Sequence, residues 1–146
     1  SDFKLCGLIW KQGDRDARNL ELAESYQERF VELVEHIRAD LAAPELPVFV
    51  LTYFDEAGIN ARRELVEKLR PNGISLYISQ ARVSSYLKNA FPVFHGLLPT
   101  VFDHVHFNSE GQLALGKLTA AAVASHYLAK ASGKTDPKKL ISIPIQ

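Results

Sequence analysis

Residues 47–54 read PVFVLTYF, a compact run of β-branched and aromatic residues that opens on a proline and closes before an acidic turn. A nearly continuous apolar run of this length is typical of a strand buried on both faces, as in a parallel sheet. A half-solvated strand would alternate apolar with polar residues. The run therefore predicts a buried parallel strand, and the segments around it decide how the sheet is connected.

A helix is predicted on each side of this strand. Over residues 20–41 apolar side chains recur at steps of four and three, which draws one stripe along a helix. The stripe consists of Leu22, Tyr26, Phe30, Val34, Ile37 and Leu41. Asn19 is a suitable cap, and two prolines within residues 42–47 end the helix. After the strand, residues 61–70 predict a shorter helix capped by Asn60.

Two further apolar runs, residues 4–10 and 74–79 (ISLYIS), predict a first and a third strand. Strand, helix, strand, helix, strand is the order of right-handed parallel crossovers, so the class is α/β. Residues 80–102 read as an apolar-rich loop with one short helix at most, suited to wall a pocket. Residues 108–130 predict the last long helix. We expect one domain over 1–131 and a tail over 132–146, whose alternating isoleucines fit an edge strand.

The composition excludes several classes of partner. Seventeen basic residues balance seventeen acidic ones, so the chain has no overall field to attract nucleic acid or an anionic membrane. No apolar run approaches the ~20 residues of a membrane span. We expect neither partner, and we expect no cofactor. The single Cys6 lies in an apolar run and reads as a small hydrophobe. The compartment stays open, with a secreted or periplasmic location among the alternatives.

The stretch of greatest chemical interest is residues 100–116, TVFDHVHFNSEGQLALG. It places Asp103 three residues before His106, just ahead of the last helix. A carboxylate so placed can orient an imidazole and stabilise its charged form, which a general base taking a proton from a hydroxyl requires. Taken alone, the stretch fits cap and surface residues equally well.

A second motif, WKQGDRD over residues 10–16, follows the first strand, at the strand end where ligand sites gather in open parallel sheets. Together the two motifs resemble the carbohydrate-esterase branch of the SGNH (GDSL-like) hydrolases, the sialate O-acetylesterase and acetylxylan esterase relatives. That branch carries W-x-Q-G-E-x-D after its third strand and D-x-x-H before its last helix. The resemblance extends from Leu5 to about Ala129. It implies a flavodoxin-like three-layer αβα sandwich with a parallel sheet.

The resemblance also implies catalytic roles. His106 would be the general base, Asp103 would orient its ring, and Gln12 would donate its side-chain amide to the oxyanion of a tetrahedral intermediate. Gly13 would let the backbone turn closely beside the ester. No metal site is expected, although a hydrolase that uses Asp103 and His106 as metal ligands, with His104 beside them, is an alternative.

Four further residues are predicted around the substrate. Asp14 stands where the family has glutamate, and Asp16 matches the family. Both carboxylates are expected to hydrogen-bond within their loop and hold Gln12 in place. Trp10 is expected as pocket wall or core, and His95 is a candidate ligand contact. Arg15 and Arg18 either meet an anionic substrate or pair with the two aspartates.

One part of the family pattern is absent. The nucleophilic serine of this family stands in a G-x-S motif after the first strand, well upstream of the Trp-Gln-Gly block, and none of the serines here stands in that context. We therefore expect the C-terminal portion of a longer esterase that deacetylates a carbohydrate or another small ester. Its missing N-terminal segment would be a partner, and the 146-residue chain alone would be inactive. The alternative is a non-catalytic carbohydrate-binding or interaction domain of the same fold.

Overall fold

In the part of the chain that the structure describes, the middle layer is a parallel sheet of three strands in the order β1-β2-β3. They are β1 (Leu8–Trp10), β2 (Val48–Thr52) and β3 (Ala90–Phe94). The computed structural model describes residues 4–103 and 105–133. In the sheet Ile9 lies beside Phe49, and Val50 lies beside Pro92. Because all strands are parallel, their carboxyl ends share one edge of the sheet.

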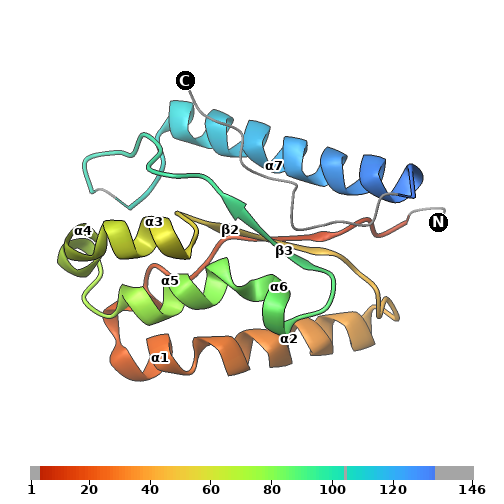
Figure 1. Cartoon of the computed structure of the whole chain (residues 1–146), viewed down its shortest axis with the longest axis horizontal. Coiled ribbons are helices and arrows are strands. Elements are labelled where there is room, and N and C mark those ends of the chain that lie inside the picture. The colour runs from red at the N-terminus through yellow and green to blue at the C-terminus, as the bar shows by residue number, and fades with distance from the viewer. Residues whose placement is uncertain (1–3, 104, 134–146) are drawn as a thin grey trace.

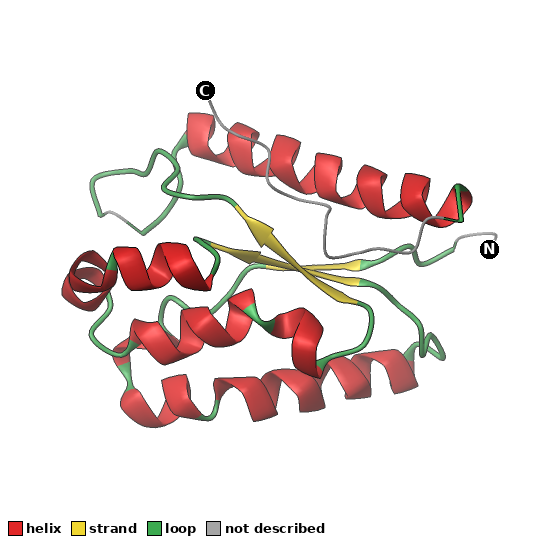
Figure 2. Ribbon diagram, in the orientation of Figure 1, coloured by secondary structure: helices red, strands yellow, loops and turns green. Residues whose placement is uncertain are grey.

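Helices cover both faces of this sheet (Figures 1 and 2). On one face lies α7 (Ser109–Ala131), which contacts β2 and β3. On the other lie α5 (Gly73–Ala81) and, packed against it, α2 (Tyr26–Asp40). The predicted three-layer αβα architecture is thus confirmed.

The strand over residues 48–52 is buried along its whole length, as its apolar run predicts. Val48 and Val50 pack into the core cluster on the α2 and α5 side. Phe49 and Leu51 point the other way, into a second cluster that includes Leu115 of α7. The strand therefore joins the two layers of the core.

The predicted helix over residues 20–41 forms as two helices, α1 (Leu20–Glu24) and α2, after a short 3₁₀ turn, η1 (Asp16–Arg18). Asn19 caps α1, since its Oδ1 accepts from the Leu22 N–H at 3.0 Å. The break falls at Ser25, whose hydroxyl donates to the Glu21 carbonyl at 2.7 Å. Such back-bonding competes with the helix ladder and bends helices.

The predicted helix over residues 61–70 forms as α4 (Arg63–Leu69), and a further helix, α3 (Glu56–Ala61), occupies residues that the sequence assigned to a turn. The cap of α3 is Asp55, whose Oδ1 accepts from the Gly58 N–H at 2.8 Å. The predicted cap Asn60 lies within α3. Helix α3 therefore begins directly behind β2 and leaves almost no turn.

The predicted third strand, residues 74–79, is wrong: these residues belong to α5. The buried residues of α5 are Gly73, Leu76, Tyr77 and Gln80, a spacing of three, one and three that places them on one helical face. The third strand is β3, in the segment that the sequence assigned to a loop. Pro92 is tolerated there because β3 is an edge strand of the described sheet.

The same segment holds the predicted short helix, α6 (Val83–Tyr86). The long helix α7 is confirmed, with Asn108 Oδ1 accepting from the Gly111 N–H at 2.9 Å as its cap. None of the helices in the described part of the chain combines the length and apolar character needed to cross a membrane. The predicted edge strand at residues 141–145 lies outside the described residues.

Candidate active site

The two motifs meet at the carboxyl ends of the strands. Residues 11–15, which follow β1, and residues 103 and 105–107, which precede α7, line one open hollow of about 1180 Å³. Gln12, Gly13, Asp14, Asp103 and His106 all face it. Segments about ninety residues apart in the sequence thus share one site.

Asp103 and His106 form a hydrogen-bonded pair. His106 Nδ1 lies 2.5 Å from Asp103 Oδ2, while Asp103 Oδ1 accepts from the backbone N–H groups of Val105 and His106 at 2.9 and 3.0 Å. The hydrogen bond from the His106 ring and those from the backbone hold the pKa of Asp103 well below its usual value. Because Asp103 is ionised, His106 Nδ1 carries the proton of this bond, and Nε2 is the ring nitrogen on the side away from the carboxylate. The imidazole is 79% exposed.

The loop that carries this pair is closed at its base. The Val101 N–H donates to the His106 carbonyl at 2.8 Å, and the Asn108 N–H donates to the Pro99 carbonyl at 3.1 Å. The first turn of α7 packs directly on this base, where a Cβ at Gly111 would collide with the Pro99 carbonyl oxygen. Helix α7 therefore braces the loop that presents His106.

The Gln12-Gly13 turn is held from α5. Gly13 has a φ of +129°, and a Cβ there would lie 2.8 Å from the Leu76 side chain. Gln80 Nε2 donates to the Gln12 carbonyl at 2.6 Å and to the Tyr26 hydroxyl at 2.9 Å. These contacts fix the backbone of Gln12, a residue that lines the hollow. The sequence did not predict the role of Gln80, because residues 74–79 were assigned to a strand and Gln80 to the loop that follows it.

Asp14 is held by side chains from four segments of the chain. It accepts from the hydroxyls of Tyr53 at 2.8 Å and Tyr77 at 3.0 Å and from Lys11 Nζ at 3.0 Å, and Arg70 Nε lies 3.4 Å away. Burial raises the pKa of Asp14, but the charge of Lys11 and the three hydrogen bonds outweigh it, so the pKa lies below its usual value. Of these partners only Lys11 belongs to the loop.

Asp16 pairs with Arg29 of α2 at 3.0 Å, so the prediction that both carboxylates bond within their loop is wrong for Asp16. For Arg15 and Arg18, contact with an anionic substrate stays a prediction. Within the described residues neither arginine makes an ion pair with Asp14 or Asp16, and both line the hollow.

Trp10 and His95 lie away from the hollow. Trp10 Nε1 donates to the Tyr26 hydroxyl at 3.1 Å, and its ring packs 5.6 Å from that of Phe30. His95 is fully buried between the rings of Tyr53 and Phe107, and burial, with the charge of Lys11, lowers its pKa to about 4. Contact of either side chain with substrate stays a prediction.

No serine, threonine or cysteine is among the described residues that line the hollow. The chain has one Gly-x-Ser triplet, Gly73-Ile74-Ser75. It forms the first turn of α5, and its exposed serine does not line the hollow. Within residues 4–103 and 105–133 no three His, Cys, Asp or Glu side chains are arranged to hold a metal ion, and His104 lies outside them.

The fold and the position of this hollow define an α/β protein with its candidate site at the carboxyl ends of parallel strands. The chain belongs to the carbohydrate esterase family described as sialic acid-specific acetylesterase, whose model matches residues 1–125. It is 28% identical over 120 residues to a probable carbohydrate esterase of Arabidopsis thaliana. That match covers 82% of this chain and 40% of the relative, so the chain spans less than half of the relative's length.

The fold is shared with a solved structure. An X-ray structure of an Arabidopsis thaliana protein matches with a TM-score of 0.57 at 24% sequence identity. The match covers 80% of this chain and 44% of the other. At this identity the likeness supports the fold.

Proposed function

We propose that this chain supplies the acid–base and oxyanion half of a carbohydrate O-acetylesterase of the SGNH type. The observation that carries the proposal is that the Asp103–His106 pair and Gln12 open into the same hollow. The family match and the relative's name support an esterase, and the acetyl specificity is part of the proposal.

The chemistry begins at His106. Its Nε2 takes the proton of a serine hydroxyl, whose oxygen attacks the acetyl carbonyl, and Asp103 stabilises the imidazolium that forms. The carbonyl oxygen gains negative charge, which the side-chain N–H of Gln12 binds. The imidazolium then returns the proton to the leaving sugar oxygen. Water repeats the sequence on the acetyl-serine and releases acetate.

The serine belongs, in this proposal, to a further segment of the same protein. Within the described residues β1 pairs only with β2, which leaves its other edge open. Ile9 lies beside the buried Phe49 and so points to the α7 face, yet it is 54% exposed. An apolar edge and face of this kind favour a covering strand.

The substrate is proposed to be an acetylated carbohydrate. The description of the family supports a sugar ester. Arg15 and Arg18, which line the hollow, favour a sugar that carries a negative charge.

A second candidate is a non-catalytic carbohydrate-binding or interaction domain. The observation that favours it is the lack of a hydroxyl or thiol nucleophile among the described lining residues. Binding of an acetylated sugar without turnover by the complete protein would support this alternative.

The test is acetylesterase turnover by the complete protein, with 4-nitrophenyl acetate as substrate. His106→Ala should lower kcat by about 10²–10⁴, the usual contribution of a general base. Gln12→Ala should lower it by about 10²–10³, the cost of one oxyanion donor. His36→Ala and Gln27→Ala, both exposed on α2, are the matched controls and should keep wild-type turnover. Unchanged turnover in the His106 variant would remove the basis of the proposal.

A further inference from the structure

A second pocket lies beside the hollow, and Phe107 forms part of the wall of both. It measures about 250 Å³. Ile59 of α3 and Val66 of α4 form part of its wall on one side, and Leu98 lies in the loop that follows β3. The catalytic roles proposed above leave this pocket unused.

The pocket offers an almost wholly apolar surface. Its main polar groups are turned toward Asp14: the hydroxyls of Tyr53 and Tyr77 donate to that carboxylate, and Arg70 Nε lies 3.4 Å from it. Apart from Thr100, aliphatic side chains and aromatic rings remain to meet a ligand. A group without hydrogen-bonding atoms therefore fits this surface best.

The pocket is open at a rim of leucines. Leu65, Leu69 and Leu97 line it and are 38%, 41% and 60% exposed. A ligand can thus enter without displacement of a buried side chain. An apolar cavity of about 150 Å³ is large enough to hold benzene. A volume of about 250 Å³ accommodates a substituted six-membered ring or a short alkyl chain.

The apolar pocket and the polar hollow meet at Phe107. Lys11 Nζ lies 5.0 Å from the centre of the Tyr53 ring and 6.0 Å from that of Phe107. Lys11 lines the hollow, whereas Tyr53 lines the pocket. A molecule that spans Phe107 would meet cationic and amide groups at one end and an apolar chamber at the other.

We propose that this pocket binds an aromatic ring or a short alkyl chain carried by the ester substrate, whose ester group lies in the hollow beside His106. The inference rests on the proposed function for its assignment to the substrate. Binding of an apolar probe to the pocket can be measured without turnover, so the two ideas can fail separately.

The binding test titrates the complete protein into 4-fluorobenzyl alcohol, followed by ligand-observed ¹⁹F NMR. Saturable binding to the wild type is expected. Leu97→Asp and Leu69→Asp, each at the exposed rim, should each raise the Kd about tenfold because a carboxylate replaces an apolar wall. Leu128→Asp is the matched control, since Leu128 is 71% exposed on α7, and it should bind as the wild type does. Thermal unfolding of each variant verifies that it is folded.

Several results would overturn the inference. It would be overturned if binding of the probe did not saturate, or if the rim variants bound the probe as tightly as the Leu128→Asp control. It would also be overturned if the control variant alone bound the probe more weakly. On the complete protein, the ratio of kcat/KM for benzyl acetate to that for ethyl acetate should fall about tenfold in Leu97→Asp. An unchanged ratio would remove the substrate assignment. If the probe binds as expected but His106→Ala keeps full turnover, the proposed function is wrong, whereas the binding of an apolar group in this pocket is still supported.

Discussion

At the scale of single residues, the Asp103–His106 pair is a local structure. A carboxylate that accepts from the backbone N–H groups two and three residues later forms a turn specified by nearby sequence alone. The ring of His106 then falls within reach of the second carboxylate oxygen. This half of the site could therefore be predicted from the sequence.

The environment of Asp14 could not be predicted in the same way. Its tyrosine partners are 39 and 63 residues away in the sequence. Tyr53 follows the end of β2 and Tyr77 lies in α5, so the position of both hydroxyls depends on how α5 packs on the sheet. Local spacing carries no signal for such contacts.

His95 gives a prediction on pH and stability. Its pKa of about 4 in the folded chain lies below the ordinary value of 6.5. Between these pH values the unfolded chain binds a proton that the folded chain does not, so the free energy of unfolding falls as the pH falls from 6.5 to 4. The loss should reach about 3 kcal/mol. Urea unfolding at several pH values measures it.

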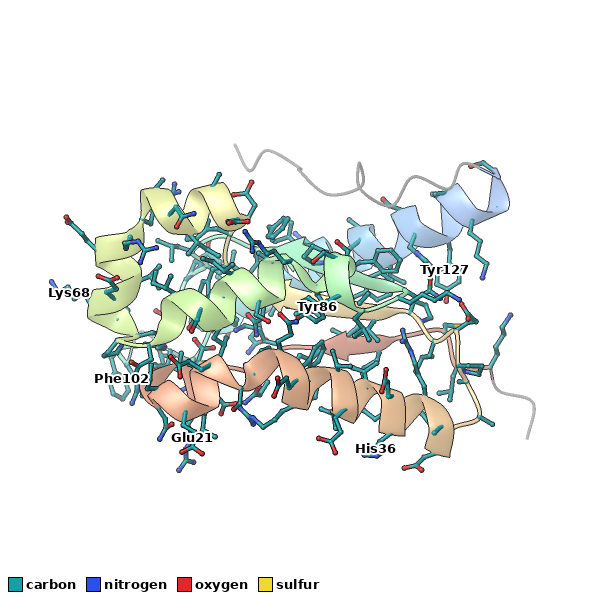
Figure 3. The ribbon with its side chains drawn as sticks, turned by 60° about the horizontal axis from the view of Figure 1, so that its bottom comes forward. Glu21, His36, Lys68, Tyr86, Phe102 and Tyr127 are labelled. Atoms are coloured by element: carbon teal, nitrogen blue, oxygen red, sulfur yellow. The ribbon has the colours of Figure 1, made fainter. Side chains whose placement is uncertain are left out.

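The matched variants are His95→Gln and His36→Gln. His95→Gln should flatten the pH dependence between pH 6.5 and 4, since the titrating group is gone. His36 lies on the outer side of α2 (Figure 3), and its replacement should leave the slope as in the wild type. Equal slopes in all three proteins would show that burial of His95 does not govern acid stability.

At the scale of elements, α7 contains a matched pair of glycines. Gly111→Ala should lower the free energy of unfolding by about 1–3 kcal/mol, because its Cβ would meet the Pro99 carbonyl at the base of the His106 loop. Gly116→Ala should raise it by about 0.5–1 kcal/mol, because a Cβ there meets nothing within 4 Å and alanine favours a helix. Chemical denaturation measures both, and effects of the same sign would contradict this account of the packing.

The elements show where sequence patterns are ambiguous. Residues 48–52 form a strand whose burial on both faces leaves only one interpretation. The run ISLYIS is short enough to fit a strand, and the buried spacing over Gly73, Leu76, Tyr77 and Gln80 is the signal that identifies a helix. The strand β3 was not predicted because it contains Pro92. A proline inside an apolar run argues against a strand unless the strand lies at a sheet edge.

At the scale of the whole molecule, the open edge of β1 predicts how the chain behaves alone. The 146-residue chain should self-associate, because Ile9 and Leu5 expose apolar surface beside an unpaired strand edge of the described sheet. Ile9→Lys should reduce this association in sedimentation velocity. Leu41→Lys, at an exposed leucine 48% accessible at the end of α2, should not. A monomeric wild-type chain that unfolds cooperatively would contradict the need for a covering segment.

The proposal that this chain supplies the general base and the oxyanion donor, but not the nucleophile, is tested most directly by locating the nucleophilic serine. The complete protein would be treated with a fluorophosphonate, which loses fluoride to an activated serine, and the modified peptide identified by mass spectrometry. We predict one adduct, on a serine outside residues 1–146, with labelling strongly reduced in His106→Ala. An adduct on a serine within these 146 residues, or labelling unaffected by the His106 substitution, would contradict the account.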